Sequence, residues 1–190
     1  MKGLLLLGRI IYRYIKKCVM AVTINPELVM KSEAEAVRAV EKYADTIRRV
    51  CFLHLKNYSD MEDEFQNVFL KYLLHTQSFE SDAHEKAWLI RVAINACKDT
   101  LKSFFRRRVT SLDNLNQELF HIQDENKYIL DAILKLPHKY KDVIYMHYYE
   151  GYTAVEIAEI LSRNENTVYT WLARARNQLK EDLGSDFFDK

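Results

Sequence analysis

The sequence is short of glycine and proline, which limits the folds that it can adopt. It contains four glycines and two prolines in 190 residues, and tight hairpin turns depend on these residue types. No segment shows the apolar–polar alternation of a half-buried strand, whereas long segments are rich in Leu, Ala, Glu, Lys, Arg and Gln, which favour helices. With 48% hydrophobic residues the chain has enough apolar side chains for real cores. We therefore expect an all-α protein.

Cysteine is also scarce. Cys18, Cys51 and Cys97 are far apart and odd in number, so they match neither a disulfide framework nor the ligand spacing of a zinc site. Cys51 and Cys97 fall on apolar faces of expected helices, and we expect both to be buried thiols. These features predict a protein of the reducing cytoplasm without a bound metal.

Catalytic motifs are missing as well. The sequence has no glycine-rich loop that could cradle a phosphate and no nucleophile motif, and its six histidines are scattered without ligand spacing. His147 fits a core or boundary position better than a metal site. We expect no enzymatic activity, no cofactor and no small-molecule substrate.

The formal net charge is only +1, yet the charges are segregated along the chain. Residues 1–20 carry five Lys or Arg and no acid, residues 98–108 carry five bases and one acid, and residues 111–126 carry four acids and no base. For a polyanionic partner the distribution of charge matters more than its sum. Basic segments separated by an acidic connector are consistent with two contacts on one nucleic acid.

Residues 1–30 are expected to be a basic N-terminal extension. The apolar run at residues 4–7 is too short to span a bilayer, and no small-residue cleavage site of a signal peptide follows it. Two interpretations stay open. The segment is either a basic amphipathic helix that rests on a membrane or a partner, or a dispensable extension with translation starting at Met20 or Met30.

Residues 31–108 have the pattern of a first helical domain. An amphipathic helix follows Ser32, and a second is predicted to start at Ser59, where Glu62 completes a capping box. A third helix, residues 83–105, gathers polar and mostly cationic residues on one side, as a surface that contacts phosphates and bases would. A solvated surface helix explains that side nearly as well, but not the arginine run that ends it. The outward residues are Arg91, Asn95, Lys98, Asp99 and Lys102, followed by Arg106, Arg107 and Arg108.

An acidic stretch of low periodicity, residues 109–126, is expected to be a flexible linker. Residues 127–185 then have the pattern of a second domain, a small bundle of four helices. Pro137 ends the first of these helices and starts the next, and Gly151 is a plausible C′ residue at the end of the second.

Residues 153–180 have the pattern of a helix-turn-helix. Thr153 and Glu156 form a capping box at the first helix, and Asn164 is a good N-cap for the second. In the second helix an apolar stripe recurs at steps of four, three and four, which defines a buried face. The stripe consists of Val168, Leu172, Ala175 and Leu179.

The opposite side of that second helix carries small polar residues in its N-terminal half and arginines further along. This arrangement is typical of a helix in the major groove, where side chains recognise base edges and cations meet phosphates. An ordinary helical hairpin with a solvated face is the alternative. The outward residues are Asn166, Thr170, Ala173, Arg174 and Asn177, with Tyr169 and Arg176 on one shoulder.

Two sets of residues resemble a bacterial RNA polymerase sigma factor of the sigma-70 family, of the small, two-domain, extracytoplasmic-function (ECF) type. In the first domain the resemblance lies in YSDMEDEFQNVFLKYLL and WLIRVAINACKDTLKS. In the second it lies in LPHKYKDVIYMHYYEGYTAVEIAEIL and NTVYTWLARARNQL. Together these motifs extend over roughly residues 37–183 in the family's order, separated by a linker, which is more specific than either set alone.

The resemblance implies three contact surfaces. Core RNA polymerase would be bound by the first domain, a sigma region 2-like domain, through Glu62, Asp63, Gln66 and Phe69. The −10 promoter element, with one base extruded from the opened strand, would be held by the loop at residues 77–86 and by Arg91, Asn95, Lys98, Asp99, Lys102, Arg106 and Arg107. The −35 element would be bound by the second domain, a region 4-like domain, through Arg163, Asn166, Tyr169, Thr170, Ala173, Arg174 and Arg176.

The implied function is promoter-specific initiation of transcription, with core polymerase and promoter DNA as partners. Relatives are commonly silenced by an anti-sigma factor, often membrane-bound, so such a partner is expected here too. The alternatives are a helix-turn-helix regulator of response-regulator type, or an adaptor held on a membrane surface by residues 1–20. Many relatives carry Gly at the position of Asn166 and basic residues near Tyr169 and Trp171. The −35 sequence that relatives recognise therefore does not transfer to this chain. Trp171 is expected to flank the core.

Overall fold

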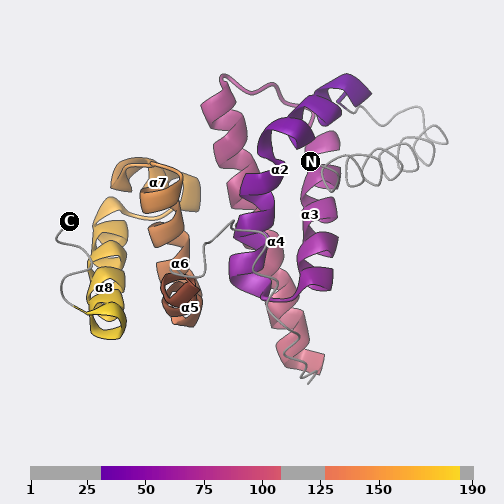
Figure 1. Cartoon of the computed structure of the whole chain (residues 1–190). Coiled ribbons are helices and arrows are strands. Elements are labelled where there is room, and N and C mark those ends of the chain that lie inside the picture. Colours follow the sequence, from indigo (N-terminus) through magenta and orange to yellow (C-terminus); the bar gives the residue numbers. More distant parts are fainter. Residues whose placement is uncertain (1–30, 108–126, 185–190) are drawn as a thin grey trace. The chain divides into compact units, whose positions relative to one another are not determined.

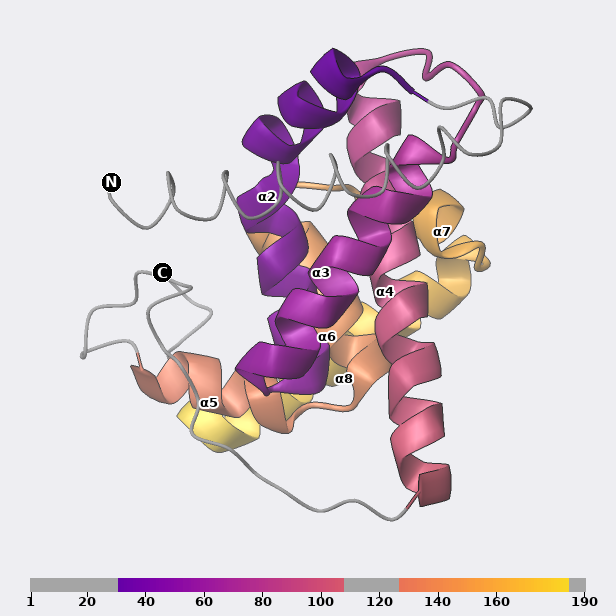
Figure 2. The same cartoon turned by 90° about the vertical axis from the view of Figure 1, so that its right-hand side faces the viewer.

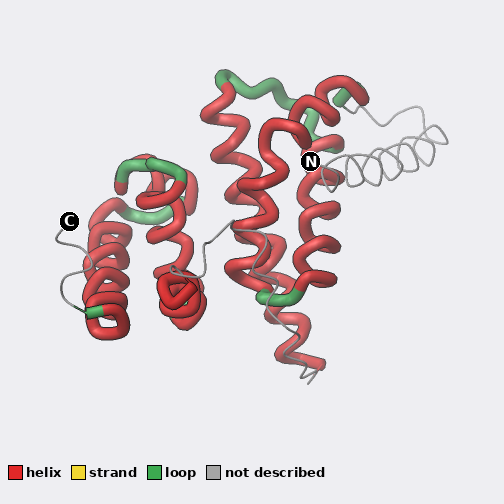
Figure 3. The backbone as a smooth tube through the Cα atoms, in the orientation of Figure 1, coloured by secondary structure: helices red, strands yellow, loops and turns green. Residues whose placement is uncertain are grey.

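A computed structural model describes residues 31–107 and 127–184, with the side chains of 31–103 and 128–184 (Figure 1). The chain divides into two compact units, residues 1–113 and 114–190, and each is considered by itself. Within the described residues every regular element is helical and none is a strand (Figure 3). The expectation of an all-α protein with two helical domains is therefore confirmed. The predictions for residues 1–30, for the linker at 109–126 and for Cys18 lie outside the described residues.

The first unit contains three long helices: α2 (Glu33–Leu55), α3 (Tyr58–Leu73) and α4 (Asp82–Arg107). Each of the three packs against the other two, and Figure 2 shows the C-terminal turns of α4 extending beyond α3. Their shared core is fully enclosed and mixes aliphatic and aromatic side chains. Its largest members with almost no exposed surface are Ile47, Phe52, Met61, Phe65, Tyr72, Leu89 and Ile90.

The start of α3 differs from the prediction. The N-cap is Asn57, whose side chain accepts a hydrogen bond from the backbone of Asp60, and the helix begins at Tyr58. Ser59 therefore lies inside the helix, and the predicted Ser59–Glu62 capping box is wrong. Asn and Ser are nearly equivalent N-caps, so the pattern alone does not distinguish the two sites. At α2 the Ser32 capping box with Glu35 is present, with both reciprocal hydrogen bonds.

Helix α4 buries a wider face than a single apolar stripe. Ile90 and Ile94 are buried together with Leu89, Ala93 and Cys97. The reason is that α4 contacts α2 and α3 at once, so two neighbouring stripes are covered. Cys51 and Cys97 are buried free thiols, as predicted, and their mutual hydrogen bond together with burial raises the pKa of Cys51.

The second unit contains α5 (Lys127–Lys135), α6 (His138–Ile144), the π-helix η3 (Tyr145–Tyr149), α7 (Ala154–Leu161) and α8 (Glu165–Leu183). Helix α8 packs against α5, α6 and α7. Its buried residues are Val168, Leu172, Ala175 and Leu179, which is the predicted stripe. The sequence does not predict the π-helical turn, since it follows α6 without a break in composition.

The helix-turn-helix geometry follows from local hydrogen bonds. Thr153 and Glu156 form the predicted capping box at α7, and Asn164 caps α8 through the backbone N–H of Asn166 at 2.9 Å. Between the helices Ser162 takes a left-handed conformation with φ 51°, and the N–H of Arg163 donates to the carbonyl of Ala158 at 2.8 Å. These bonds close the turn and determine where α8 begins.

Candidate polymerase and promoter-DNA surfaces

The outward face of α3 is small and acidic. Asp63 is exposed, and Gln66 is half-buried beside it. The side chain of Glu62 is only 17% exposed, and its Oε2 lies 3.9 Å from Nε of Arg48. Burial raises the pKa of Glu62, and the nearby Arg48 guanidinium offsets only part of that increase. Asp63 is thus the acid on this face most open to a partner, whereas Glu62 is held by an internal ion pair.

Phe69 does not belong to that surface. Its side chain is 3% exposed, and its ring lies 5.0 Å from the ring of Phe65 in the core. The expectation that Phe69 contacts a partner directly is corrected by this burial. A buried aromatic ring supports the outward face of α3 from beneath.

The outward face of α4 matches the predicted set of residues. Arg91, Asn95, Asp99 and Lys102 are exposed and Lys98 is half-buried. Asp99 accepts a hydrogen bond from Lys102 at 3.0 Å, and this bond lowers the pKa of Asp99. Asp99 is therefore paired within its own helix, which fits a role in orienting Lys102. Arg106 and Arg107 lie in the last turn of α4, beyond the described side chains.

An aromatic cluster lies between the C-terminal end of α3 and the first turns of α4. The ring of Trp88 lies 4.5 Å from that of His75 and 5.6 Å from that of Phe79, and His75 stacks on Phe79 at 4.9 Å. Lys31 is placed over the Phe79 ring, 5.0 Å from its centroid. Burial, together with the positive charge of Lys31, lowers the pKa of His75. The low periodicity of this stretch predicts only a loop, and the density of its aromatic residues is the signal that points to a packed cluster.

A buried carboxylate attaches the start of α4 to the other two helices. Glu85 is 3% exposed and accepts hydrogen bonds from Arg38 at 2.6 Å, Tyr72 at 2.5 Å and Tyr43 at 3.0 Å. Burial alone would raise the pKa of Glu85, but the bonds from Arg38, Tyr72 and Tyr43 outweigh it and hold that pKa below its ordinary value.

Helix-start signals in the sequence do not predict this network, because they explain Glu85 as a first-turn acid. The spacing of four residues between Glu85 and Leu89 places Glu85 on the buried face and is the signal that could have revealed it. Next to Glu85 the exposed Asp82 pairs with Lys42 at 2.6 Å, so a second ion pair joins the start of α4 to α2.

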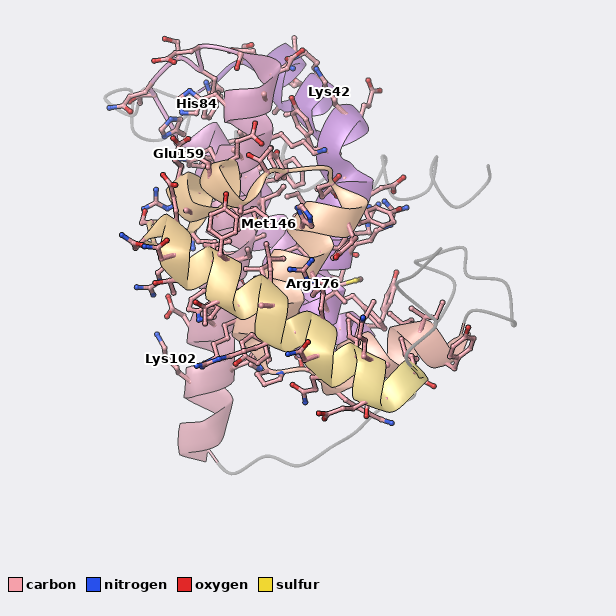
Figure 4. All side chains as sticks on the ribbon, turned by 90° about the vertical axis from the view of Figure 1, so that its left-hand side faces the viewer. Lys42, His84, Lys102, Met146, Glu159 and Arg176 are labelled. Carbon is pink, nitrogen blue, oxygen red and sulfur yellow. The ribbon has the colours of Figure 1, made fainter. Side chains whose placement is uncertain are left out.

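Helix α8 presents its predicted outer residues to solvent. All of the predicted −35 residues are exposed in the structure, namely Arg163, Asn166, Tyr169, Thr170, Ala173, Arg174 and Arg176. Figure 4 shows the side chains along α8, with Arg176 labelled. Trp171 is half-buried and lies under Lys139, whose Nζ is 5.9 Å from the ring centroid. Trp171 thus flanks the core, as expected.

The described part of the chain contains neither a metal-binding cluster nor a helix that could span a membrane. Among residues 31–107 and 127–184 no group of three or more His, Cys, Asp or Glu side chains is arranged to hold a metal ion. None of the described helices combines the length and the apolar character needed to cross a bilayer.

Two family models match the chain, one in each unit. The model of sigma-70 region 2 matches residues 39–108, and the model of sigma-70 region 4 matches residues 126–179. Together they match well over half of the chain, in the order predicted from the motifs.

Curated proteins and solved structures agree with these matches. The chain is 28% identical to the ECF RNA polymerase sigma factor SigW of Bacillus subtilis, over 76% of this chain and 86% of SigW. It is 29% identical to the RNA polymerase sigma factor SigV of Bacillus subtilis, over 80% of this chain and 96% of SigV.

Similar folds occur in two solved complexes, at 20% identity in each case. One is the sigma factor RpoE of Bartonella quintana with the anti-sigma factor NepR, with a TM-score of 0.67 over 78% of this chain and 96% of RpoE. The other is CnrH with the cytosolic domain of CnrY, with a TM-score of 0.60 over 82% of this chain and 91% of CnrH. From the two matched regions and these relatives, the chain belongs to the sigma-70 family of RNA polymerase sigma factors and is of the ECF type.

Proposed function

We propose that this protein is a promoter-specificity factor that binds core RNA polymerase, directs it to −35 and −10 elements and assists promoter melting, without catalysis of its own. The observation that carries the proposal is the presence of region 2 and region 4 in one chain. A helix-turn-helix regulator that acts outside the polymerase would need only the second. The regulator of response-regulator type is therefore not favoured.

Core polymerase would dock on the outward face of α3. Asp63 supplies an exposed carboxylate and Gln66 a neighbouring amide, while the Arg48–Glu62 pair and the buried Phe69 hold the helix in place. Charged groups at the edge of such an interface favour the correct partner and speed association.

The −10 element would be opened and held by the first unit. The outward face of α4 offers Arg91, Lys98 and Lys102 to phosphates and Asn95 to a base. Extruding a base costs a few kcal/mol, and stacking on an aromatic side chain returns about 1 to 3 kcal/mol per base. Phe79 belongs to the loop at residues 77–86, of which residues 82–86 form the start of α4. Its contacts with His75 and Trp88 would support this loop against the two helices.

The −35 element would be bound as duplex by α8, which presents Asn166, Tyr169, Thr170, Ala173 and Arg174 to the major groove. Arg163 and Arg176 are available to phosphates on either side. The relatives RpoE and CnrH were solved with the anti-sigma factor NepR and with the cytosolic domain of CnrY, and we infer an antagonist of this type, membrane-bound or free, for this chain in the cytoplasm.

Charge reversal at Asp63 tests the docking surface. Asp63→Arg is expected to weaken binding to core polymerase by about tenfold or more, because it places a positive charge where the partner meets a carboxylate. Glu41→Arg is the matched control, since Glu41 is an exposed acid on α2, and it should bind core as the wild type does. Titration of fluorescently labelled full chain with purified core polymerase measures both. Equal affinity of Asp63→Arg and wild type would contradict the assignment.

A further inference from the structure

The hydroxyl of Thr170 is already occupied within the helix. Its Oγ1 donates a hydrogen bond of 2.7 Å to the backbone carbonyl of Asn166, one turn earlier. Threonine commonly makes this bond in helices, where it uses the only hydroxyl hydrogen of the side chain. Thr170 is nevertheless exposed. In this conformation the hydroxyl does not donate to a base and keeps only its acceptor lone pairs, so the apolar surface that the side chain offers to a partner is its methyl group.

A second methyl group lies next to it on the same face. Ala173 follows Thr170 by three residues, so the two are neighbours on the helix surface, and Ala173 is exposed as well. Tyr169, 54% exposed, adds its ring beside them. The middle of the outward face of α8 is therefore apolar, between the amide of Asn166 and the guanidinium of Arg174.

In the major groove, methyl groups on a protein have one specific counterpart. Thymine alone among the four bases carries a 5-methyl group there, and Ala, the Thr methyl and Phe are the apolar side-chain groups that commonly pack against it. Cytosine presents a bare ring edge and an amino donor at the same place, which an apolar strip leaves unsatisfied.

We infer that Thr170 and Ala173 determine −35 specificity by packing against the 5-methyl groups of thymines, so that the DNA facing the centre of α8 is rich in A·T pairs. The inference rests on the proposed function. It follows from the intrahelical hydrogen bond of Thr170 and from the exposure of Thr170 and Ala173.

The test removes single methyl groups from the DNA and from the protein. A promoter is first selected from a pool randomised across the −35 region, by transcription with core polymerase and the full chain. Each thymine of the selected −35 element is then replaced by deoxyuridine, which differs only by the 5-methyl group. At one or more positions we expect transcription to fall by about fourfold, the effect of losing one buried methyl.

Thr170→Ser removes the methyl from the protein and keeps the hydroxyl. It should lower transcription from the thymine promoter by a similar factor and abolish the deoxyuridine effect at one position. Thr170→Val keeps a methyl and should retain that effect. Circular dichroism of both variants should match the wild type, because the side chain is exposed.

The outcomes distinguish failure of the thymine-methyl inference from failure of the proposed function. Normal transcription with no deoxyuridine-sensitive position overturns the inference and leaves the proposed function intact. A sensitive position that persists in both Thr170→Ser and Ala173→Gly assigns the methyl contact to other residues and also overturns it. Failure to select any promoter from the pool overturns the proposed function and the inference together.

Discussion

Replacing Glu85 by alanine is expected to lower the free energy of unfolding of the first unit by about 3 kcal/mol. The substitution removes the acceptor of three hydrogen bonds, so that the hydroxyls of Tyr43 and Tyr72 lose a buried partner. Arg38 contributes less to the loss, because its side chain is 47% exposed and regains water. The measurement is urea unfolding of the full chain carrying Trp171→Phe, followed by tryptophan fluorescence. Trp88 is then the remaining tryptophan, so the signal reports the first unit alone.

Glu85→Gln separates charge from shape. The glutamine amide has almost the same size as the carboxylate and still accepts a hydrogen bond. The decrease in the free energy of unfolding should therefore be smaller than for alanine. Because the folded-state pKa of Glu85 is depressed, its ionised form stabilises the fold above the unfolded-state pKa of about 4.3. That contribution disappears as the pH falls through the lower folded-state pKa. The stability difference between wild type and Glu85→Gln should thus be largest above a pH of about 5 and shrink in acid. A difference that does not change with pH would show that the charge of Glu85 contributes nothing.

Leu172→Ala should unfold much of the second unit. Leu172 is 4% exposed and lies in the stripe of α8 that packs against α5, α6 and α7. Truncating a buried leucine costs about 2 to 5 kcal/mol, which is a large share of the stability of so small a domain. Trp171 fluorescence in a Trp88→Phe background measures the effect, and binding to −35 duplex should be lost with it.

Tyr169→Ala is the control for Leu172→Ala. Tyr169 lies three residues before Leu172 in the same helix, but its side chain is 54% exposed. The unfolding midpoint of Tyr169→Ala should therefore change little, while its binding to DNA weakens. If Leu172→Ala left the midpoint unchanged, the packing of α8 described above would be wrong. The first unit should unfold as in wild type in both variants, because each substitution lies within the second compact unit.

Apart from the π-helix η3, the helices of the second unit and the buried stripe of α8 can be predicted from the sequence. Its signals are local: the capping box of α7 and the N-cap of α8 lie within three residues of their targets, and the apolar stripe of α8 recurs at steps of three and four. The outward residues of α8 and α4 can be predicted from the same pattern, because side chains that are not on the apolar side of a helix face solvent.

Most features that the sequence does not predict depend on contacts between residues distant along the chain, and the N-cap of α3 is a local exception. The partners of Glu85 come from α2 and α3, 13 to 47 residues away, and no local period reveals them. Family resemblance places Phe69 on a surface, and only the packing of three helices around it shows that it is buried. The N-cap of α3 is ambiguous because Asn57 and Ser59 are equally suitable in isolation.

Promoter-dependent transcription with purified components tests the central claim most directly. Core RNA polymerase, the full chain and a template carrying the DNA upstream of the chain's own gene should together yield one discrete transcript. That transcript should vanish when either the −35 or the −10 element is scrambled, and Asp63→Arg should reduce it while Glu41→Arg does not. Absence of any promoter-dependent transcript, together with failure of the chain to bind core polymerase, would contradict the account.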